Sequence, residues 1–374
     1  MNKIPLARPF IPENAMSRLE QVLKSGFLSD GPVTYEFENK VANYIGARYG
    51  VSFNSCTTGM ETALRSIGLT KGDEVIIPGY TFPATANAVY ATGAEPVLVD
   101  VDKNTGNIDY SKIEQAINSR TKAIFPVSLF GNPLDYAELN RIKNKFGLRL
   151  IEDAACSIGS SYDGVLTGNL ADATIFSFHP RKIVTTGEGG VLTTDNPEIA
   201  RFCRSYKYFG MRTEIREGEI EIVKNNFEMN GSNFKLSSLH AALGISQMEI
   251  IDDLLVERDR LAKRYSCLLE TMEEVQVLKV TPKGKHSYQS YCILLPHRNK
   301  IIEEMRKRGI ETQVGSISLH DQAAFQNTRI SGELKNSSAL GNVCMALPFY
   351  NGMTEEEQDF VVRELNSSLQ EVRS

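Results

Sequence analysis

The sequence lacks the features that mark several common classes of protein. Its six cysteines form no CxxC pair, which favours reduced thiols in the cytoplasm over disulfides or a zinc site. Its five histidines show neither HExxH nor another metal-ligand spacing. No apolar run has the length of a membrane span, and the first residues lack the apolar core of a secretory signal. We therefore expect a cytoplasmic protein with no metal site and no membrane partner.

Positive charge and phosphate-loop motifs are missing as well. The formal net charge is −5, so no global positive field would attract nucleic acid. The chain has no Walker A lysine motif, and the cluster Gly187–Gly190 does not fit GxGxxG. A nucleic-acid-binding protein, an NTPase and a nicotinamide-dependent dehydrogenase are therefore disfavoured.

Strand-like and helix-like segments alternate through the first two thirds of the chain, as in parallel α/β folds. Strand-like runs cover residues 74–77, 96–101, 123–128, 149–152, 174–178 and 190–194. A charged helix over roughly residues 250–272 then leads to a mixed α+β part, whose last helix starts at Thr354 with a capping box to Glu357. We predict a large α/β domain over residues 1–250 and a smaller α+β domain over residues 251–374. The charged segment 212–230 is expected to form an exposed loop or hairpin.

The stretch around Lys182 is the most informative feature present. A β-rich run ends at Ser177, and a glycine-rich turn follows the lysine. A lysine just past a buried strand, five positions after a hydroxyl residue, suits imine formation with a carbonyl cofactor whose phosphate rests on that hydroxyl and nearby amides. A lone lysine in such a place is more often a surface loop residue, so the prediction depends on two further segments.

The first of these segments ends a strand with Asp153, and the second opens a helix with small hydroxyl residues after position 51. Ligands of open α/β sheets bind beyond the carboxyl ends of the strands, where Asp153 could pair with a protonated pyridine nitrogen or simply cap a helix. Cys56, Thr57 and Thr58 precede the apolar face of the second segment. Free amides at that helix N-terminus would bind an anion, although ordinary helix capping also explains the hydroxyl residues there.

Together these segments resemble the DegT/StrS group of nucleotide-sugar aminotransferases, which are fold-type I pyridoxal phosphate (PLP) enzymes of the aspartate aminotransferase superfamily. Further blocks in the family's order extend the resemblance over nearly the whole chain, at residues 5–9, 25–32, 72–78, 80–85, 93–102, 130–133 and 233–244. The resemblance implies an α/β large domain with a mostly parallel seven-stranded sheet flanked by helices, a smaller α+β C-terminal domain, and a homodimer with shared active sites.

The resemblance also implies roles for residues around the cofactor ring. Lys182 would bind PLP as an imine and later move the proton, with a pKa lowered towards neutrality by burial and by the cationic ring. Asp153 would pair with the pyridine nitrogen, and Phe82 would stack on the ring. Cys156 stands where many relatives have glutamine and Ser128 where they have histidine, which leaves the contact to the 3-hydroxyl group open.

The phosphate of PLP would be surrounded by Cys56, Thr57 and Ser177 of the same subunit. Asn233 matches a residue that reaches the phosphate from the neighbouring subunit. Both expectations come from the resemblance.

The implied reaction moves an amino group from an amino acid, L-glutamate by analogy, to C4 of a keto-deoxyhexose linked to a nucleoside diphosphate, for amino-sugar synthesis in glycans such as O-antigen or capsule. The candidate substrate contacts line the open side of the site: Leu28, Ser29, Asp30, His179, Arg181 and His320. Arginine favours bidentate phosphate contact, whereas for His320 a solvated loop position is the commoner interpretation and a contact to sugar or nucleotide the less common one. Alternatives are amination at C3, a PLP-dependent sugar dehydratase, in which histidine replaces the lysine, and a non-catalytic regulatory relative.

Overall fold

The computed structural model describes residues 3–216 and 219–373 of the chain. Its centre is an eight-stranded sheet in the order β1-β10-β9-β6-β5-β2-β4-β18. The bounds are β1 Tyr49–Phe53, β2 Glu74–Pro78, β4 Glu95–Val99, β5 Thr121–Ile124, β6 Arg149–Asp153, β9 Ala173–Ser177, β10 Gly190–Thr194 and β18 Arg329–Ile330. β10 runs antiparallel to both of its neighbours, β1 and β9, and the other neighbouring strands of this sheet pair in parallel.

The mostly parallel α/β architecture predicted from the sequence is confirmed. Seven strands come from residues 1–250, and the eighth, β18, is added at the edge by the C-terminal part. β18 was not predicted because its pairing with β4 covers only two residues, too few for a strand pattern to register in the sequence.

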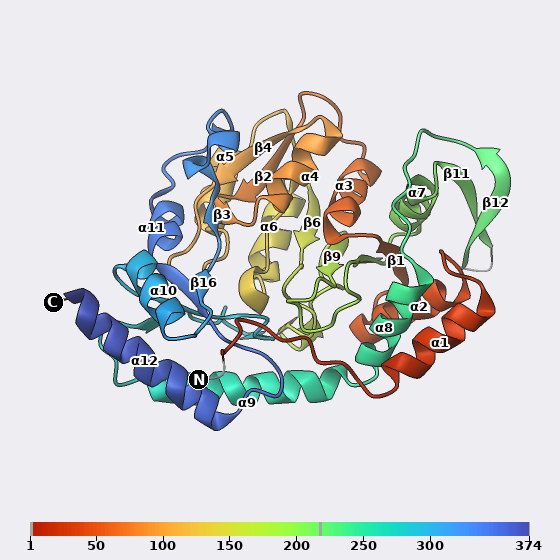
Figure 1. Cartoon of the computed structure of the whole chain (residues 1–374). Coiled ribbons are helices and arrows are strands. Elements are labelled where there is room, and N and C mark those ends of the chain that lie inside the picture. The colour runs from red at the N-terminus through yellow and green to blue at the C-terminus, as the bar shows by residue number, and fades with distance from the viewer. Residues whose placement is uncertain (1–2, 217–218, 374) are drawn as a thin grey trace.

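Helices cover both faces of this sheet, which explains why its strands are apolar without alternation (Figure 1). The helices before residue 250 are α1 Ala15–Ser25, α2 Pro32–Ile45, α3 Cys56–Ser66, α4 Ala84–Thr92, α5 Tyr110–Ala116, α6 Tyr136–Phe146, α7 Pro197–Lys207 and α8 Ser238–Met248. The helices α3, α4 and α7 share one apolar cluster with one face of the sheet. The opposite face packs against α5 and α6, and further along against α2 and α8.

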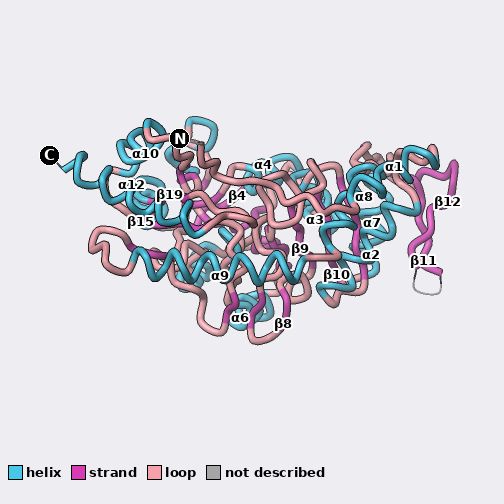
Figure 2. The backbone as a smooth tube through the Cα atoms, turned by 60° about the horizontal axis from the view of Figure 1, so that its bottom comes forward, coloured by secondary structure: helices cyan, strands magenta, loops and turns pink. Residues whose placement is uncertain are grey.

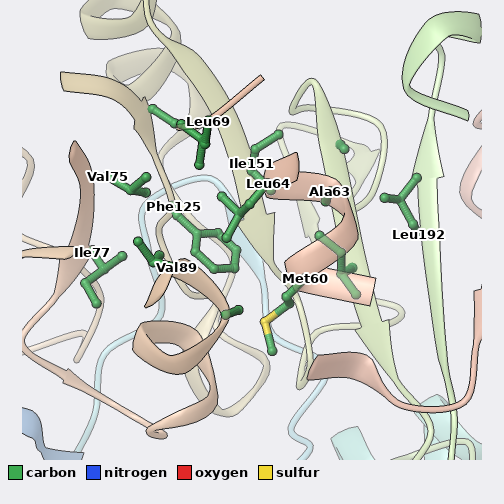
Figure 3. Close-up of a cluster of buried hydrophobic side chains, with 14 of the residues drawn as sticks. Met60, Ala63, Leu64, Leu69, Val75, Ile77, Val89, Phe125, Ile151 and Leu192 are labelled. Atoms are coloured by element: carbon green, nitrogen blue, oxygen red, sulfur yellow. The ribbon is translucent and has the colours of Figure 1, made fainter. Parts of the chain in front are cut away.

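The packing of α3 positions the site described below. Met60 and Leu64 point from α3 into a cluster with Val75 and Ile151 of the sheet and with Phe125, which follows β5 (Figure 3). All five side chains are buried. The N-terminal turn of α3 is therefore held rigidly above the carboxyl ends of the strands.

The C-terminal part forms a second apolar core around a four-stranded sheet in the order β13-β15-β19-β16. Its elements are α9 Ile251–Leu269, β13 Gln276–Val277, β15 Tyr291–Leu294, α10 Arg298–Lys307, β16 Gln313–Val314, α11 Lys335–Val343, β19 Cys344–Leu347 and α12 Glu355–Arg373. The predicted capping box is present, since Thr354 Oγ1 accepts from Glu357 N (3.2 Å) and Glu357 Oε2 accepts from Thr354 N (3.0 Å). The boundary after residue 250 coincides with the start of α9 and remains a prediction.

Short elements complete the chain. They are β3 Tyr80–Thr81 paired with β17 Ile317–Ser318, the group β7 Ser161–Tyr162, β8 Val165–Leu166 and β14 Gly284–Lys285, and the 3-10 turns η1 Leu129–Gly131, η2 Leu319–Asp321 and η3 Ala323–Phe325. The segment expected to be an exposed loop or hairpin contains the antiparallel pair of β11 Met211–Arg216 and β12 Glu219–Phe227. This pair lies at the opposite end of the molecule from α10 and α12 (Figure 2). None of the described helices combines the length and apolarity needed to cross a bilayer.

Candidate active site

Three segments distant in the sequence meet at one edge of the large sheet. β6 ends at Asp153 and β9 ends at Ser177. In the antiparallel pairs, Gly190 lies in register with both Ser177 and Phe53, so the end of β1 reaches the same edge. Carboxyl ends of parallel strands are the usual ligand-binding edge of such sheets.

Asp153 is buried beneath this edge, with 4% of its surface exposed. One carboxylate oxygen accepts from the Thr85 hydroxyl (2.7 Å) and the other from the Ala155 amide (3.1 Å). Burial raises the pKa of Asp153, against the lowering effects of these two hydrogen bonds and of the Lys182 charge. The carboxylate is thus fixed in orientation and keeps lone pairs available for a further donor.

Lys182 follows β9 in a turn closed by a hydrogen bond from its own amide to His179 O (2.9 Å). Its partly buried side chain donates from Nζ to Cys156 Sγ at 3.1 Å. Burial lowers the pKa of Lys182, but Cys156, Cys56 and Asp153 outweigh this effect and leave the pKa raised. The expected lowering is therefore not produced by the groups of the chain itself, because thiol and carboxyl groups surround the amine.

The N-terminus of α3 offers free backbone donors beside the amine and the carboxylate. Ser55 caps the helix by accepting from Thr58 N (3.2 Å). Within the described part of the chain, the amides of Cys56 and Thr57 have no acceptor. Two unpaired amides at the positive end of a helix dipole form an anion site.

Gly190 allows this helix end to approach the sheet closely. A Cβ on Gly190 would lie 2.7 Å from Cys56 Cα, 2.8 Å from Cys56 N and 2.9 Å from Ser55 O. All three are backbone atoms, so no side-chain rotation could relieve the overlap. The glycine cluster was visible in the sequence, but the need for glycine at this position follows only from the packing of α3.

Phe82 and Asn233 lie at the margins of the site. Phe82 lies just before the start of α4. Its carbonyl oxygen accepts a hydrogen bond from the amide of Thr85 (3.2 Å), and its side chain is exposed (68%). The exposed ring of Phe82 lies close in sequence to Thr85, whose hydroxyl orients Asp153, and such a ring can stack on a planar ligand. Asn233 is exposed, and its side chain accepts from Lys235 Nζ at 2.7 Å. No contact joins it to Lys182 within the described part of its own chain, and its predicted role in a neighbouring subunit stays a prediction.

The candidate substrate residues fall into two groups. His179 and Arg181 flank the amine: Arg181 is exposed and donates to the Gln313 side chain at 2.5 Å. His179 Nδ1 accepts from Arg181 N (3.3 Å), and burial lowers the pKa of His179. Leu28 and Ser29 are exposed, and both carbonyls bond to the start of α8.

Asp30 and His320 are placed differently from what the sequence suggested. The Asp30 side chain is buried and pairs with Lys207 Nζ (3.3 Å) rather than facing the open side. Lys207 is itself fully buried and also binds Glu38 (2.9 Å). His320 is not a solvated loop side chain, because its two ring nitrogens bond to the hydroxyls of Ser318 and Ser338.

Glu152 was not singled out from the sequence, yet it is a buried carboxyl next to Asp153. Strand alternation turns it to the opposite face of β6. There it accepts from Tyr136 (2.7 Å), from Thr174 (3.3 Å) and from Ser128. Burial raises the pKa of Glu152 to about 7, even though these three hydrogen bonds lower it. Ser128 is therefore engaged with Glu152.

Comparisons with known proteins agree with this geometry. The DegT/DnrJ/EryC1/StrS aminotransferase family matches residues 9–366. The chain belongs to this family. GDP-perosamine synthase of Caulobacter vibrioides is 33% identical over 98% of this chain and 98% of its own. PseC of Helicobacter pylori, an aminotransferase in the biosynthesis of pseudoaminic acid, is 26% identical over 99% of this chain and 100% of its own, with a TM-score of 0.90. The putative sugar aminotransferase Spr1654 of Streptococcus pneumoniae in its PMP form is 28% identical over 99% and 100%, with a TM-score of 0.87.

The family, the fold-type I architecture and the enzyme class predicted from the sequence are thereby confirmed. Aminotransferases of this family depend on PLP, and the site fits that cofactor on its own geometry. It combines a partly buried amine, a buried carboxylate, an exposed aromatic ring and two unpaired helix amides. The amine suits the aldehyde of PLP, the carboxylate suits its pyridine nitrogen, the aromatic ring suits the face of its ring, and the amides suit its phosphate.

Proposed function

We propose that this chain transfers an amino group from L-glutamate to C4 of a keto-deoxyhexose linked to a nucleoside diphosphate. The observation that carries the proposal is the convergence of Lys182, Asp153 and the first amides of α3 at one sheet edge. GDP-perosamine synthase and PseC, both similar over nearly the full chain, act in amino-sugar synthesis by their names and support a sugar substrate.

The chain's residues would hold the cofactor as follows. The amides of Cys56 and Thr57, with the Ser177 hydroxyl, bind the phosphate at the N-terminus of α3. Phe82 covers one face of the ring. When bound, PLP supplies an electron-accepting ring that withdraws electrons from the reacting carbon. Asp153 holds a proton on the ring nitrogen by its negative charge, and its own orientation is set by Thr85 and Ala155.

Lys182 acts as the proton carrier. Its Nζ takes a proton from the amino donor's α-carbon, and later returns one to the sugar carbon that becomes aminated. An amine with a raised pKa must lose its proton before it can act as a base. Pairing of Asp153 with a cationic ring would remove one of the groups that raise this pKa. His179 and Arg181 stand beside the lysine, where Arg181 can bind the diphosphate bidentately.

The proposal includes a cytoplasmic homodimer in which Asn233 of a partner subunit completes the phosphate site. All six cysteines are free thiols in the structure, which agrees with a reducing compartment. Phe209, 49% exposed, donates its amide hydrogen bond to Ser232 O beside Asn233, and Lys235 Nζ lies 4.3 Å from the centre of its ring. A partly exposed aromatic ring therefore lies next to Asn233. Sedimentation that finds a fully active monomer would contradict the shared site.

The test is a panel of nucleotide-linked keto-sugars with glutamate as donor, followed by mass spectrometry and NMR of the products. The proposal predicts a 4-amino sugar and release of 2-oxoglutarate. Amination at C3 would correct the position alone. Loss of a hydroxyl group would indicate a dehydratase, and a complete lack of turnover with a bound cofactor would indicate a regulatory relative.

A further inference from the structure

Cys156 places a thiol directly against the lysine amine. Its Sγ accepts the hydrogen bond from Lys182 Nζ at 3.1 Å. The residue lies in the turn after β6, which is closed by a hydrogen bond from Ser157 N to Ala154 O (3.0 Å), so the backbone that carries the sulfur is held in place. Among the described residues, Cys156 is the only cysteine that accepts a hydrogen bond from a lysine.

Access separates Cys156 from the other thiols. Cys56, Cys203, Cys292 and Cys344 are buried, whereas Cys156 is partly exposed and Cys267 is exposed. Burial raises the pKa of the Cys56 thiol well above its ordinary value, which keeps it protonated and unreactive. Reactive cysteines are typically partly exposed and lie beside a cationic side chain, and Cys156 combines partial exposure with the 3.1 Å contact to the Lys182 amine.

We propose that Cys156 and Lys182 form a redox-sensitive pair, in which peroxide oxidation of Cys156 leads to a covalent sulfur–nitrogen bond with Lys182. In the first step the Cys156 thiol reacts with hydrogen peroxide. The sulfur–oxygen bond forms, the oxygen–oxygen bond breaks, and water leaves with the thiol proton. Sulfur loses two electrons to peroxide, and the product is a sulfenic acid.

In the second step the Lys182 amine attacks the oxidised sulfur. The sulfur–nitrogen bond forms, the sulfur–oxygen bond breaks, and the hydroxyl leaves as water with a proton from the amine. No further oxidant is consumed. A small-molecule thiol reverses the reaction by attacking the sulfur, which frees the amine, and a second thiol then releases Cys156 as a disulfide forms between the two small molecules.

The local electrostatics favour this order of events. The anionic form of Cys156 is one of the groups that raise the pKa of Lys182. A sulfenic acid carries no such charge, so oxidation leaves burial as an opposing effect and makes the amine easier to deprotonate. The flexible lysine stem lets Nζ close the remaining distance to the sulfur.

The test treats the purified full chain, after release of any bound PLP, with hydrogen peroxide and then maps its peptides without reduction. The expected product has an intact mass lower by two hydrogen atoms, a peptide joining residues 156 and 182, and lost tryptic cleavage after Lys182. Dithiothreitol should restore all three. The Cys156→Ser variant should not form the product, whereas the Cys267→Ser variant should form it like the wild-type chain.

Two results would overturn the inference. One is oxidation of Cys156 to sulfinic acid while Lys182 stays free, and the other is oxidation of the Cys156 thiol no faster than that of Cys267. The control of activity by this bond rests on the proposed function, but its formation does not. Addition of PLP distinguishes the formation of the bond from the proposed function. If the linked peptide forms even with saturating PLP, the cofactor role of Lys182 is contradicted, and if PLP prevents the link, that role is supported.

Discussion

Replacing Gly190 with alanine should weaken cofactor binding while leaving the fold in place. The new Cβ would meet three backbone atoms of Ser55 and Cys56 at 2.7 to 2.9 Å, whereas carbon atoms in contact prefer about 3.5–4.0 Å. The start of α3 must therefore move away from β10 by roughly 0.7 Å. A phosphate hydrogen bond of ordinary length would then be stretched beyond about 3.5 Å and lost.

The expected change in the Kd for PLP follows from the hydrogen bonds between the phosphate and the α3 amides that would be lost. A hydrogen bond to a charged group contributes about 1.5–3 kcal/mol, and about 1.4 kcal/mol corresponds to a tenfold change in Kd. Loss of one amide contact, from Cys56 or Thr57, should raise the Kd for PLP by about 10- to 100-fold. The overlap itself should cost about 1–3 kcal/mol of stability.

The assay is a titration of each variant with PLP, followed by absorbance of the bound cofactor, with circular dichroism as the check of folding. Gly31→Ala is the matched control. The backbone of Gly31 is extended (φ −173°), and a Cβ added there would have Ser29 O as its nearest neighbour, at an ordinary 3.4 Å. The control should bind PLP like the wild-type chain. A folded Gly190→Ala variant with unchanged Kd would show that the α3 amides do not hold the phosphate.

Asp153→Asn should keep PLP bound but lower kcat by orders of magnitude, because an amide cannot hold the ring nitrogen protonated; unchanged kinetics would reduce Asp153 to a structural residue. Lys207→Met should destabilise the chain by about 3–5 kcal/mol, because it leaves the buried Asp30 carboxylate without its cation, while Glu38 keeps Arg204 as a partner. The exposed Lys24→Met should change stability by about 0.5 kcal/mol or less in chemical denaturation. Folding favours the protonated form of Glu152, so its stabilising contribution is complete below its ordinary pKa of 4.5 and is lost as the pH rises through about 7. Glu152→Gln should flatten the dependence of melting temperature on pH over this range, and an unaltered dependence would contradict the raised pKa.

The sequence was sufficient to predict the ends of these strands to within one residue. β6 ends at Asp153 and β9 ends at Ser177, where the expected runs ended at residues 152 and 178, because apolar runs followed by polar residues mark strand ends, and parallel strand ends share one edge. The helix beginning at Cys56 was likewise predictable from its hydroxyl residues and apolar periodicity.

What escaped prediction depends on contacts between distant segments. The pairing of Asp30 with Lys207 joins residues 177 positions apart, and no local pattern distinguishes a buried lysine from an exposed one. The closeness of Cys156 to Lys182 depends on the shape of two turns, and the strict need for glycine at position 190 depends on the approach of α3. The eighth strand is only two residues long, so tertiary pairing rather than strand propensity creates it.

The most direct test of the central claim is the Lys182→Ala variant, with two measurements on the same sample. One is the absorbance band of PLP bound to a lysine, and the other is amino transfer from glutamate to a nucleotide-linked keto-sugar. The account predicts that both disappear while circular dichroism stays unchanged, and that the Lys24→Met control retains both. Amino transfer by Lys182→Ala at near the wild-type rate would contradict the assignment of Lys182 as the catalytic amine.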